Sequence, residues 1–228
     1  MSTKPFIPLL GKRIRVTRLD ECGAYPEAAE TDAFIATGGF VTVSLSAEVE
    51  DGEEILKKRA DGSICVNEKQ SDSFKNFTIE MEFCDVNPSL IALMTNAEPY
   101  ENYEGDVVGF TVPEGSIDKF FALEIWTGLS GQACEGGTAQ SGYMLLPFVQ
   151  AGVLGDIEIT GEDTIDFSMT GAYTKGGHSW GVGPYDVAMD ESTAAPLPTA
   201  LDPFDHFLMM TTEVAPPEED DDPQPMPE

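Results

Sequence analysis

The chain has 228 residues, of which 41% are hydrophobic and 23% charged, and its formal net charge is −29. This length can bury a full core and fits a single domain. Only two bases, Lys119 and Lys175, follow residue 75, and such an acidic chain repels phosphate, so nucleic-acid binding is not expected. No apolar run reaches the roughly 18 residues of a membrane-spanning helix, and residues 1–10 lack the apolar core of a secretion signal. Synthesis in the cytosol, without membrane attachment, is the resulting expectation.

Two segments near the N-terminus alternate in the manner of β-strands. Residues 12–19 alternate basic and apolar side chains, which predicts a half-buried strand whose outer face carries Arg13, Arg15 and Arg18. Residues 40–49 alternate apolar side chains with Thr, Ser and Glu, which predicts a second strand with one face in the core.

Two polar runs follow these strands. EDGEE at Glu50–Glu54 and KKRADG at Lys57–Gly62 are both interpreted as hairpin turns, because Asp-Gly pairs favour tight turns between strands. The acids of the first run could also bind a divalent cation, but their spacing is not that of a calcium-binding loop. A solvated turn is the preferred interpretation.

Residues 77–83 give the cleanest strand pattern of the chain. Four apolar side chains alternate there with Thr78, Glu80 and Glu82. The two acids could form a carboxylate pair for acid–base chemistry, but no nucleophile or histidine lies near them in the sequence. A polar outer face of a sheet is the preferred interpretation.

One short helix is signalled after this strand. Asn87 is a good N-cap and Pro88 suits the first helical position. Apolar residues then recur at helical spacing, and the helix is predicted to end near Thr95–Asn96, before Pro99.

The sequence of the second half of the chain predicts strands joined by turns. Glycine-rich breaks separate apolar runs of strand length over residues 121–187. The predicted fold is therefore mostly β, with two packed sheets and one short flanking helix in a domain of residues 1–187. Residues 188–214 are predicted to be an extended linker or docking arm, in which HFLMM forms a last strand or docks. Residues 215–228 are acidic and proline-rich, which predicts a flexible tail.

The sequence offers no recognisable metal, cofactor or catalytic motif. The four cysteines, Cys22, Cys65, Cys84 and Cys134, form no CxxC pair, so a zinc site is not expected. Cytosolic synthesis favours free thiols. The glycine-rich runs match neither a phosphate-binding loop nor a nucleophile elbow. No cofactor is predicted, and a catalytic role is not expected.

Several short words occur in one order along residues 12–187 and together resemble the major tail (tail tube) proteins of long-tailed bacteriophages, most closely those of phages infecting actinobacteria. The words LEIWTG, LLPFVQAGVLGDIEI and TGAYT…WGVGPYDV carry most of this likeness. The earlier words that agree are RIRVTRLDECG, GFVTVSLSAEVEDGEEI, DGSICV and FTIEMEFCDVNPSLIALMTN. The acidic C-terminal tail is not part of the resemblance.

The resemblance implies a structural protomer of a tail tube. Such protomers form stacked rings, expected to be hexameric, whose inner sheets join into a β-lined channel that conducts DNA without binding it specifically. It also implies contacts with tape-measure, tail terminator and distal tail proteins, and a place in the virion tail after assembly in the host cytoplasm. The chain's acidity then suggests a channel wall of negative charge, for which Glu80 and Glu82 are the candidate residues.

Assembly contacts are expected at strand edges and in two loop regions. The candidate assembly residues are Glu50, Asp51, Gly52, Glu53, Lys57, Lys58, Arg59, Gly131 and Gly137. The C-terminal segment is expected to dock on the protein surface, with its acidic run held by the basic first strand. The candidate docking residues are Arg13, Arg15, Arg18, Phe207, Leu208 and Met209.

Two alternatives remain open from the sequence. A capsid-decoration or head–tail joining protein belongs to the same structural class. A carbohydrate-binding β-sandwich belongs to another class, in which Trp126, Trp180, Tyr173 and Tyr185 would be stacking platforms for sugar rings.

Overall fold

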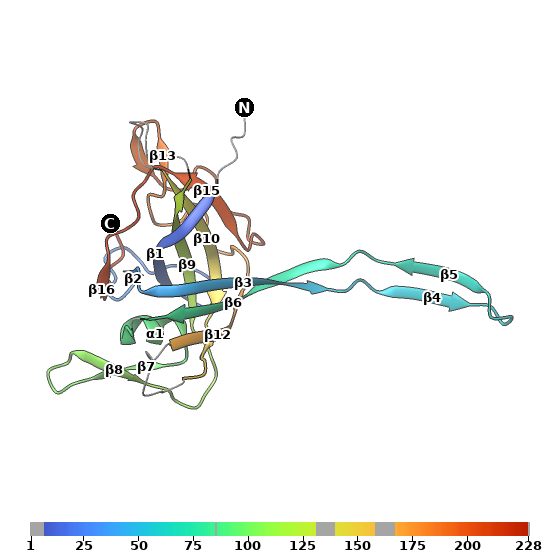
Figure 1. Cartoon of the computed structure of the whole chain (residues 1–228), viewed down its shortest axis with the longest axis horizontal. Coiled ribbons are helices and arrows are strands. Elements are labelled where there is room, and N and C mark those ends of the chain that lie inside the picture. The colour runs from blue at the N-terminus through green and yellow to red at the C-terminus, as the bar shows by residue number, and fades with distance from the viewer. Residues whose placement is uncertain (1–6, 85, 131–139, 158–166, 228) are drawn as a thin grey trace.

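The computed structural model describes residues 7–84, 86–130, 140–157 and 167–227 (Figure 1). The protein is mostly β, with 52% of its residues in strands, in packed antiparallel sheets with a single short helix among the described residues. The predicted fold class is thereby confirmed. In chain order the elements are β1 (Pro8–Leu19), β2 (Phe34–Thr37), β3 (Phe40–Glu50), β4 (Glu54–Lys58), β5 (Ile64–Lys69), β6 (Ser73–Phe83), α1 (Pro88–Met94), β7 (Glu98–Glu101), β8 (Val107–Thr111), β9 (Phe120–Leu129), β10 (Ser141–Gln150), β11 (Val153–Leu154), β12 (Phe167–Thr174), β13 (Ala188–Asp190), β14 (Thr193–Ala195), β15 (Leu208–Thr212) and β16 (Asp220–Gln224).

The two layers of the body are parts of one hydrogen-bonded sheet. Eight strands follow the order β16-β2-β1-β9-β10-β12-β6-β3, while β15 pairs with β10 and β11 pairs with β12. The sheet folds over at β10, whose pairing with β9 shifts register between Leu146 and Val149. Beyond this shift β10 pairs with β12 through Val149 and Gln150 alone. The layer of β12, β6 and β3 therefore turns across the layer of β1, β9 and β10 (Figure 1).

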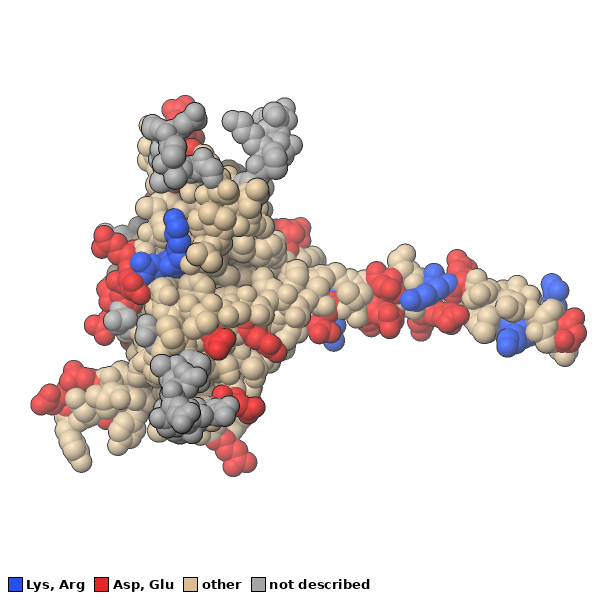
Figure 2. All heavy atoms as spheres, viewed as in Figure 1, with Lys and Arg blue, Asp and Glu red and all other residues tan. Residues whose placement is uncertain are grey.

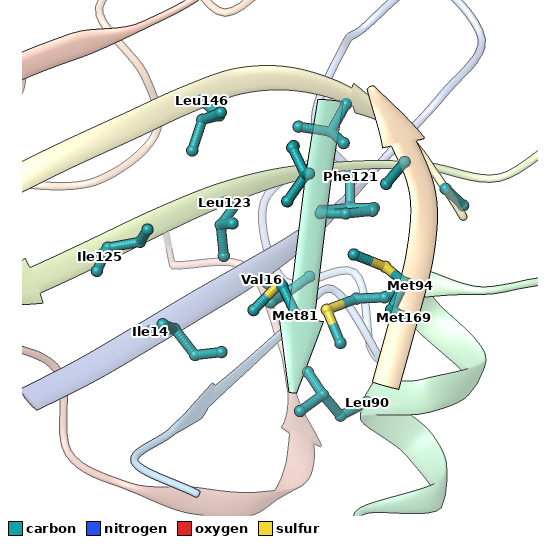
Figure 3. Close-up of a cluster of buried hydrophobic side chains, with 14 of the residues drawn as sticks. Ile14, Val16, Met81, Leu90, Met94, Phe121, Leu123, Ile125, Leu146 and Met169 are labelled. Atoms are coloured by element: carbon teal, nitrogen blue, oxygen red, sulfur yellow. The ribbon is translucent and has the colours of Figure 1, made fainter. Parts of the chain in front are cut away.

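A hydrophobic cluster fills the space between the two layers. It contains Ile14 and Val16 from β1, Phe121 and Leu123 from β9, and Met81 from β6, together with residues of β2, β10, β12 and α1. Figure 3 shows these side chains converging from both layers, with α1 closing one end. The strand prediction for residues 77–83 is confirmed, because Ile79, Met81 and Phe83 are buried while Glu80 is exposed.

The helix forms where the sequence predicts it. The Asn87 side chain accepts a hydrogen bond from the Leu90 N–H at 3.1 Å, and Pro88 occupies the first turn. The helix ends at Thr95, whose N–H and hydroxyl both donate to the Ile91 carbonyl. Leu90, Ile91 and Met94 are buried, so the apolar stripe of α1 seals the open end of the core.

The central strands are buried on both faces. The C-terminal half of the chain covers the outer face of β1, β9 and β10 with a second cluster that includes Trp126, Tyr143, Trp180 and Tyr185. This double burial explains why β9 and β10 read as nearly continuous apolar runs instead of alternating ones.

The C-terminal segment differs from the predicted linker and flexible tail. Ala188–Asp190 and Thr193–Ala195 pair as a small hairpin, and β16 pairs with β2. The pairing of β15 with β10 agrees with the last strand expected at HFLMM. Leu197 and Met226 are 5% and 3% exposed and belong to the second cluster. These two buried side chains, together with the strand pairing, give an otherwise proline-rich segment a fixed path over the body.

Candidate assembly surfaces

A two-stranded antiparallel arm projects far from the body (Figure 1). It is built from the outer part of β3 followed by β4, and from β5 followed by the first part of β6, with Val49 opposite Phe74 and Glu54 opposite Lys69. Its tip is the turn after Lys58, where the Arg59 N–H donates to the Ser63 carbonyl at 2.7 Å and Gly62 has φ +85°. The turn predicted at KKRADG is therefore present.

The turn predicted at EDGEE is wrong. Glu50, Asp51, Gly52 and Glu53 lie in the middle of one side of the arm, where the chain continues straight from β3 into β4. The Gly52 N–H donates to Asp72 Oδ1 at 2.9 Å, and the Gln70 N–H donates to the Glu53 carbonyl at 3.0 Å. A Cβ at Gly52 would lie 2.0 Å from the Gln70 carbonyl oxygen. Gly52 therefore allows the backbones of the two sides of the arm to approach closely. In the sequence, a glycine needed for close approach looks the same as a glycine needed for a turn.

The arm exposes apolar side chains on a structure that has no core of its own. Among the described residues, the large exposed apolar residues of the arm and its root are Val49, Ile55, Leu56, Ile64, Val66 and Phe74. Ile55 lies opposite Glu68 and Lys57 opposite Val66, so one face of the ribbon alternates apolar and charged residues. An isolated two-stranded ribbon is marginally stable in water, and exposed apolar strand surface of this kind is typical of contact sites.

The arm also carries much of the positive charge of an acidic protein. Lys57, Lys58 and Arg59 lie at the tip and Lys69 lies further back, 3.1 Å from Asp72. Figure 2 shows these basic side chains interspersed with acids along the arm, while the visible face of the body is richer in acids. A basic tip on an acidic protein favours contact with another acidic surface.

The arm is anchored at its root by aromatic contacts. The Phe74 ring lies 4.9 Å from the Phe77 ring and 5.2 Å from His206, and Phe77 contacts Phe207. His206 Nδ1 lies 2.7 Å from Thr174 Oγ1. The candidate docking segment therefore packs between the arm root and the body.

The remaining docking residues continue this contact along β15. Phe207 packs on the inner cluster and Leu208 on the outer one, while Met209 is 37% exposed. HFLMM accordingly both docks and supplies a last strand for β10, with Leu145 opposite Leu208.

The three arginines of β1 have three different partners. Arg13 Nη1 lies 2.6 Å from Glu219 Oε2 in the acidic C-terminal run, whereas Arg18 pairs with Glu30 at 2.5 Å. Arg15 is 7% exposed, so the prediction of a cationic outer face is wrong at this position. Of the predicted set, only Arg13 meets the acidic run.

Arg15 belongs to a buried polar cluster beneath the C-terminal layer. Its Nε and Nη2 donate to the two carboxylate oxygens of Glu124 at 2.5 and 2.7 Å, and the Tyr143 hydroxyl donates to Glu124 Oε1 at 2.6 Å. The guanidinium carbon lies 3.3 Å from the centre of the Tyr185 ring. Sequence reading missed this cluster, although Glu124 is a lone acid inside the apolar run FFALEIWTGL, which is the signal that could have revealed it.

Burial and mutual charge interactions shift the pKa values of Tyr143 and Arg15 from their ordinary values. Burial, reinforced by the Glu124 carboxylate, holds the pKa of Tyr143 well above its ordinary value. Burial opposes the charge of Arg15, yet Glu124 outweighs it and the pKa of Arg15 is raised. The charges satisfy each other away from solvent, so the cluster locks the C-terminal layer onto β1 and β9.

The candidate channel residues lie together on one polar face. Glu80 and Glu82 project from the side of β6 opposite the core, and their partners on β3 are Ser44 and Thr42. Glu80 is exposed and Glu82 is half-buried. The outer face of the β3–β6 layer is thus polar and acidic.

The proposed sugar-stacking platforms are mostly core residues. Trp126 and Trp180 are each 2% exposed and Tyr185 is 6% exposed, while Tyr173 is half-buried and donates its hydroxyl proton to Gln150. Trp126, Trp180 and Tyr185 are therefore too buried to stack against a sugar ring. The carbohydrate-binding interpretation, which depended on these side chains, is not supported.

Gly131 and Gly137 lie outside the described residues. Within the described part of the chain, no group of three or more His, Cys, Asp or Glu side chains is placed to hold a metal ion. No helix in that part is long and apolar enough to cross a membrane.

No protein-family model matches the chain, and no curated protein matches it.

Proposed function

We propose that the protein is a self-assembling structural protomer of a phage tail tube. The observation that carries this proposal is the arm, which exposes apolar side chains at a distance from a body whose own core is complete. Exposed apolar strand surface is costly unless a partner covers it. The sequence resemblance to major tail proteins supplies the kind of partner, which is other copies of the same chain.

The charge distribution supports assembly between copies. The arm tip concentrates Lys57, Lys58 and Arg59, whereas residues after Lys75 carry only Lys119 and Lys175 as bases. A basic tip attracted to the acidic body of a neighbour gives association a preferred direction. The resemblance implies stacked rings, and in this proposal the arms hold neighbouring copies together.

The polar outer face of β3 and β6 is proposed to line the channel. Glu80 and Glu82 lie there, and the described part of this face carries no Lys or Arg between Phe77 and Phe83. A wall that neutralises no phosphate lets DNA pass without capturing it. Tape-measure, terminator and distal tail proteins are the partners proposed inside and at the ends of the tube.

Electron microscopy of the purified protein over a range of concentrations tests the proposal. Filaments of uniform width with an axial channel are the expected result. A protein that stays monomeric at high concentration, and that is absent from the tails of isolated particles, would contradict it. Binding to capsid surfaces instead of tube formation would favour a decoration or joining protein.

A further inference from the structure

The edge of β2 is covered by the chain's own C-terminus. β2 lies at one end of the folded sheet, where a terminal strand offers unpaired N–H and C=O groups. β16 lies against it, with Asp220 opposite Ala36 and Gln224 opposite Phe34. The Ala33 N–H donates to the Gln224 carbonyl at 2.9 Å. The tail thus occupies a site that would otherwise accept a strand.

The pairing of β16 is poor by the standards of the sheet. Its register shifts between Asp220 and Gln224, and Pro223 has no N–H to donate. The run Glu218–Asp222 places five acids in succession, which repel one another and the acidic body. The chain leading into β16 contains Pro216 and Pro217, and residues 213–219 form no strand.

Backbone hydrogen bonds and side-chain contacts hold the tail in place. Besides the bond from the Ala33 N–H, the Ala29 N–H donates to the Met226 carbonyl at 3.1 Å and the Met226 N–H donates to the Glu30 carbonyl at 3.0 Å. Glu219 accepts a hydrogen bond from the Gly38 N–H at 2.9 Å and pairs with Arg13, but the Glu219 side chain is 51% exposed. Exposed ion pairs contribute little to stability. Met226 is the inner anchor, with its sulfur 3.5 Å from the Tyr185 hydroxyl. The tail is therefore held firmly around Met226, whereas its acidic stretch depends on the surface contacts of Glu219 and is the part that a competing strand can displace.

The opposite end of the sheet is β3, which pairs with β6 alone among the described strands. The outer half of β3 carries Glu48 and Glu50. Each copy therefore has one end that accepts a strand beside Arg13 and another that offers an acidic strand. Such unlike ends can join head to tail, an arrangement that gives a ring when the rotation between neighbouring copies closes.

We infer that β16 is a removable cover that keeps the β2 edge closed in the free chain until β3 of a second copy replaces it. The acids of β3 then take the place of Glu219 beside Arg13. This inference rests on the proposed self-assembly, and it adds a control over when assembly begins.

A reversible crosslink tests the cover directly. Ala36→Cys and Asp220→Cys, in a protein whose four native cysteines are serine, join β16 to β2 when oxidised and release it when reduced. The matched control is Met189→Cys with Ala194→Cys, which joins the register partners of the β13–β14 hairpin. Self-association is measured by sedimentation velocity in both redox states.

The oxidised A36C/D220C protein is expected to associate about tenfold or more weakly than its reduced form, because apparent affinity falls with the open fraction of the site. The control pair should associate equally in both states. Equal association of the two redox forms of A36C/D220C, or no association of either, would overturn the inference.

A second variant makes the test independent of the crosslink. Removing the surface contact with Glu219→Ala leaves Met226 in place and should make association stronger at a given concentration, whereas unchanged or weaker association would count against the cover. Microscopy of both redox forms separates the two proposals. Tubes from both forms would retain the tail-tube proposal and reject the cover. Closed rings that form only after reduction and never stack into tubes would support the cover and count against the tail tube.

Discussion

The arm and the central strands of the body are both antiparallel β-structure, yet they meet water in opposite ways. β9 and β10 are buried on both faces, between the inner cluster and the C-terminal layer. β4 and β5 are exposed at every residue. Strand pairing alone does not stabilise a two-stranded ribbon. The body is therefore stable by itself, whereas the arm needs contact with another copy of the chain to cover its apolar side chains. Changes in the two regions should therefore separate stability from assembly.

The largest effect on stability is expected at the buried ion pair. Arg15→Met leaves the Glu124 carboxylate, which is fully buried, without its cation. Breaking one partner of such a pair costs about 3–5 kcal/mol in the free energy of unfolding, measured by denaturant titration. The double variant Arg15→Met with Glu124→Leu should recover most of the loss, because no buried charge remains. A single variant as stable as wild type would mean that Tyr143 and its neighbours suffice for the carboxylate.

The arm should behave in the opposite way. Ile55→Ser with Val66→Ser removes two apolar side chains from one face of the ribbon and should change the free energy of unfolding by no more than about 0.5 kcal/mol. The association constant measured by sedimentation should fall at least about tenfold, which corresponds to about 1.4 kcal/mol of association free energy, and tube yield should fall with it.

The control for this pair is Glu54→Ser with Lys69→Ser, register partners whose joint removal leaves the net charge unchanged. It should keep most of the tube yield. If both double variants assemble like wild type, the apolar face of the arm is not a contact site.

In both regions, how well a feature could be predicted depends on whether its contacts are local in the sequence. The strand at residues 77–83 and the helix after Asn87 follow local rules of alternation and capping, and both form as predicted. The Gly in EDGEE reads locally as a turn, but its role is set by Gln70 on the other side of the arm. Arg15 likewise alternates as an outer residue, and only its pairing with Glu124, more than a hundred residues later, makes it a core residue. Local patterns in the sequence were enough to predict the strand and the helix. The roles of Gly52 and Arg15 depend on contacts with residues far along the chain, which local patterns do not show.

A smaller effect is expected where the two sides of the arm cross. Gly52→Ala places a Cβ against the Gln70 carbonyl, so the sides must separate and lose hydrogen bonds worth about 1 kcal/mol each. Hydrogen exchange should accelerate in β4 and β5 while the body strands stay protected. Gly109→Ala in β8 is the matched control, since a Cβ there meets no atom within 4 Å, and exchange in the arm should not change. Unaltered exchange in G52A would mean that the crossing relaxes without cost.

The smallest effect concerns pH at the arm root. Burial first, and then the positive field of His178, lower the pKa of His206 below its ordinary value, against an opposing effect of Asp205. The unfolded chain therefore takes up the proton first as the pH falls through about 6.5, and the contribution of neutral His206 declines from there down to its folded pKa. In this window the folded chain keeps His206 neutral and in contact with Thr174 and Phe74, but proton uptake by the unfolded chain lowers the free energy of unfolding. Because the site is partly exposed, the change is small, and it is best seen as the difference between wild type and His206→Gln in melting temperature at about pH 7 and about pH 5.5. The variant should lose less on acidification than wild type, and identical losses would show that the arm root does not depend on the protonation state of His206.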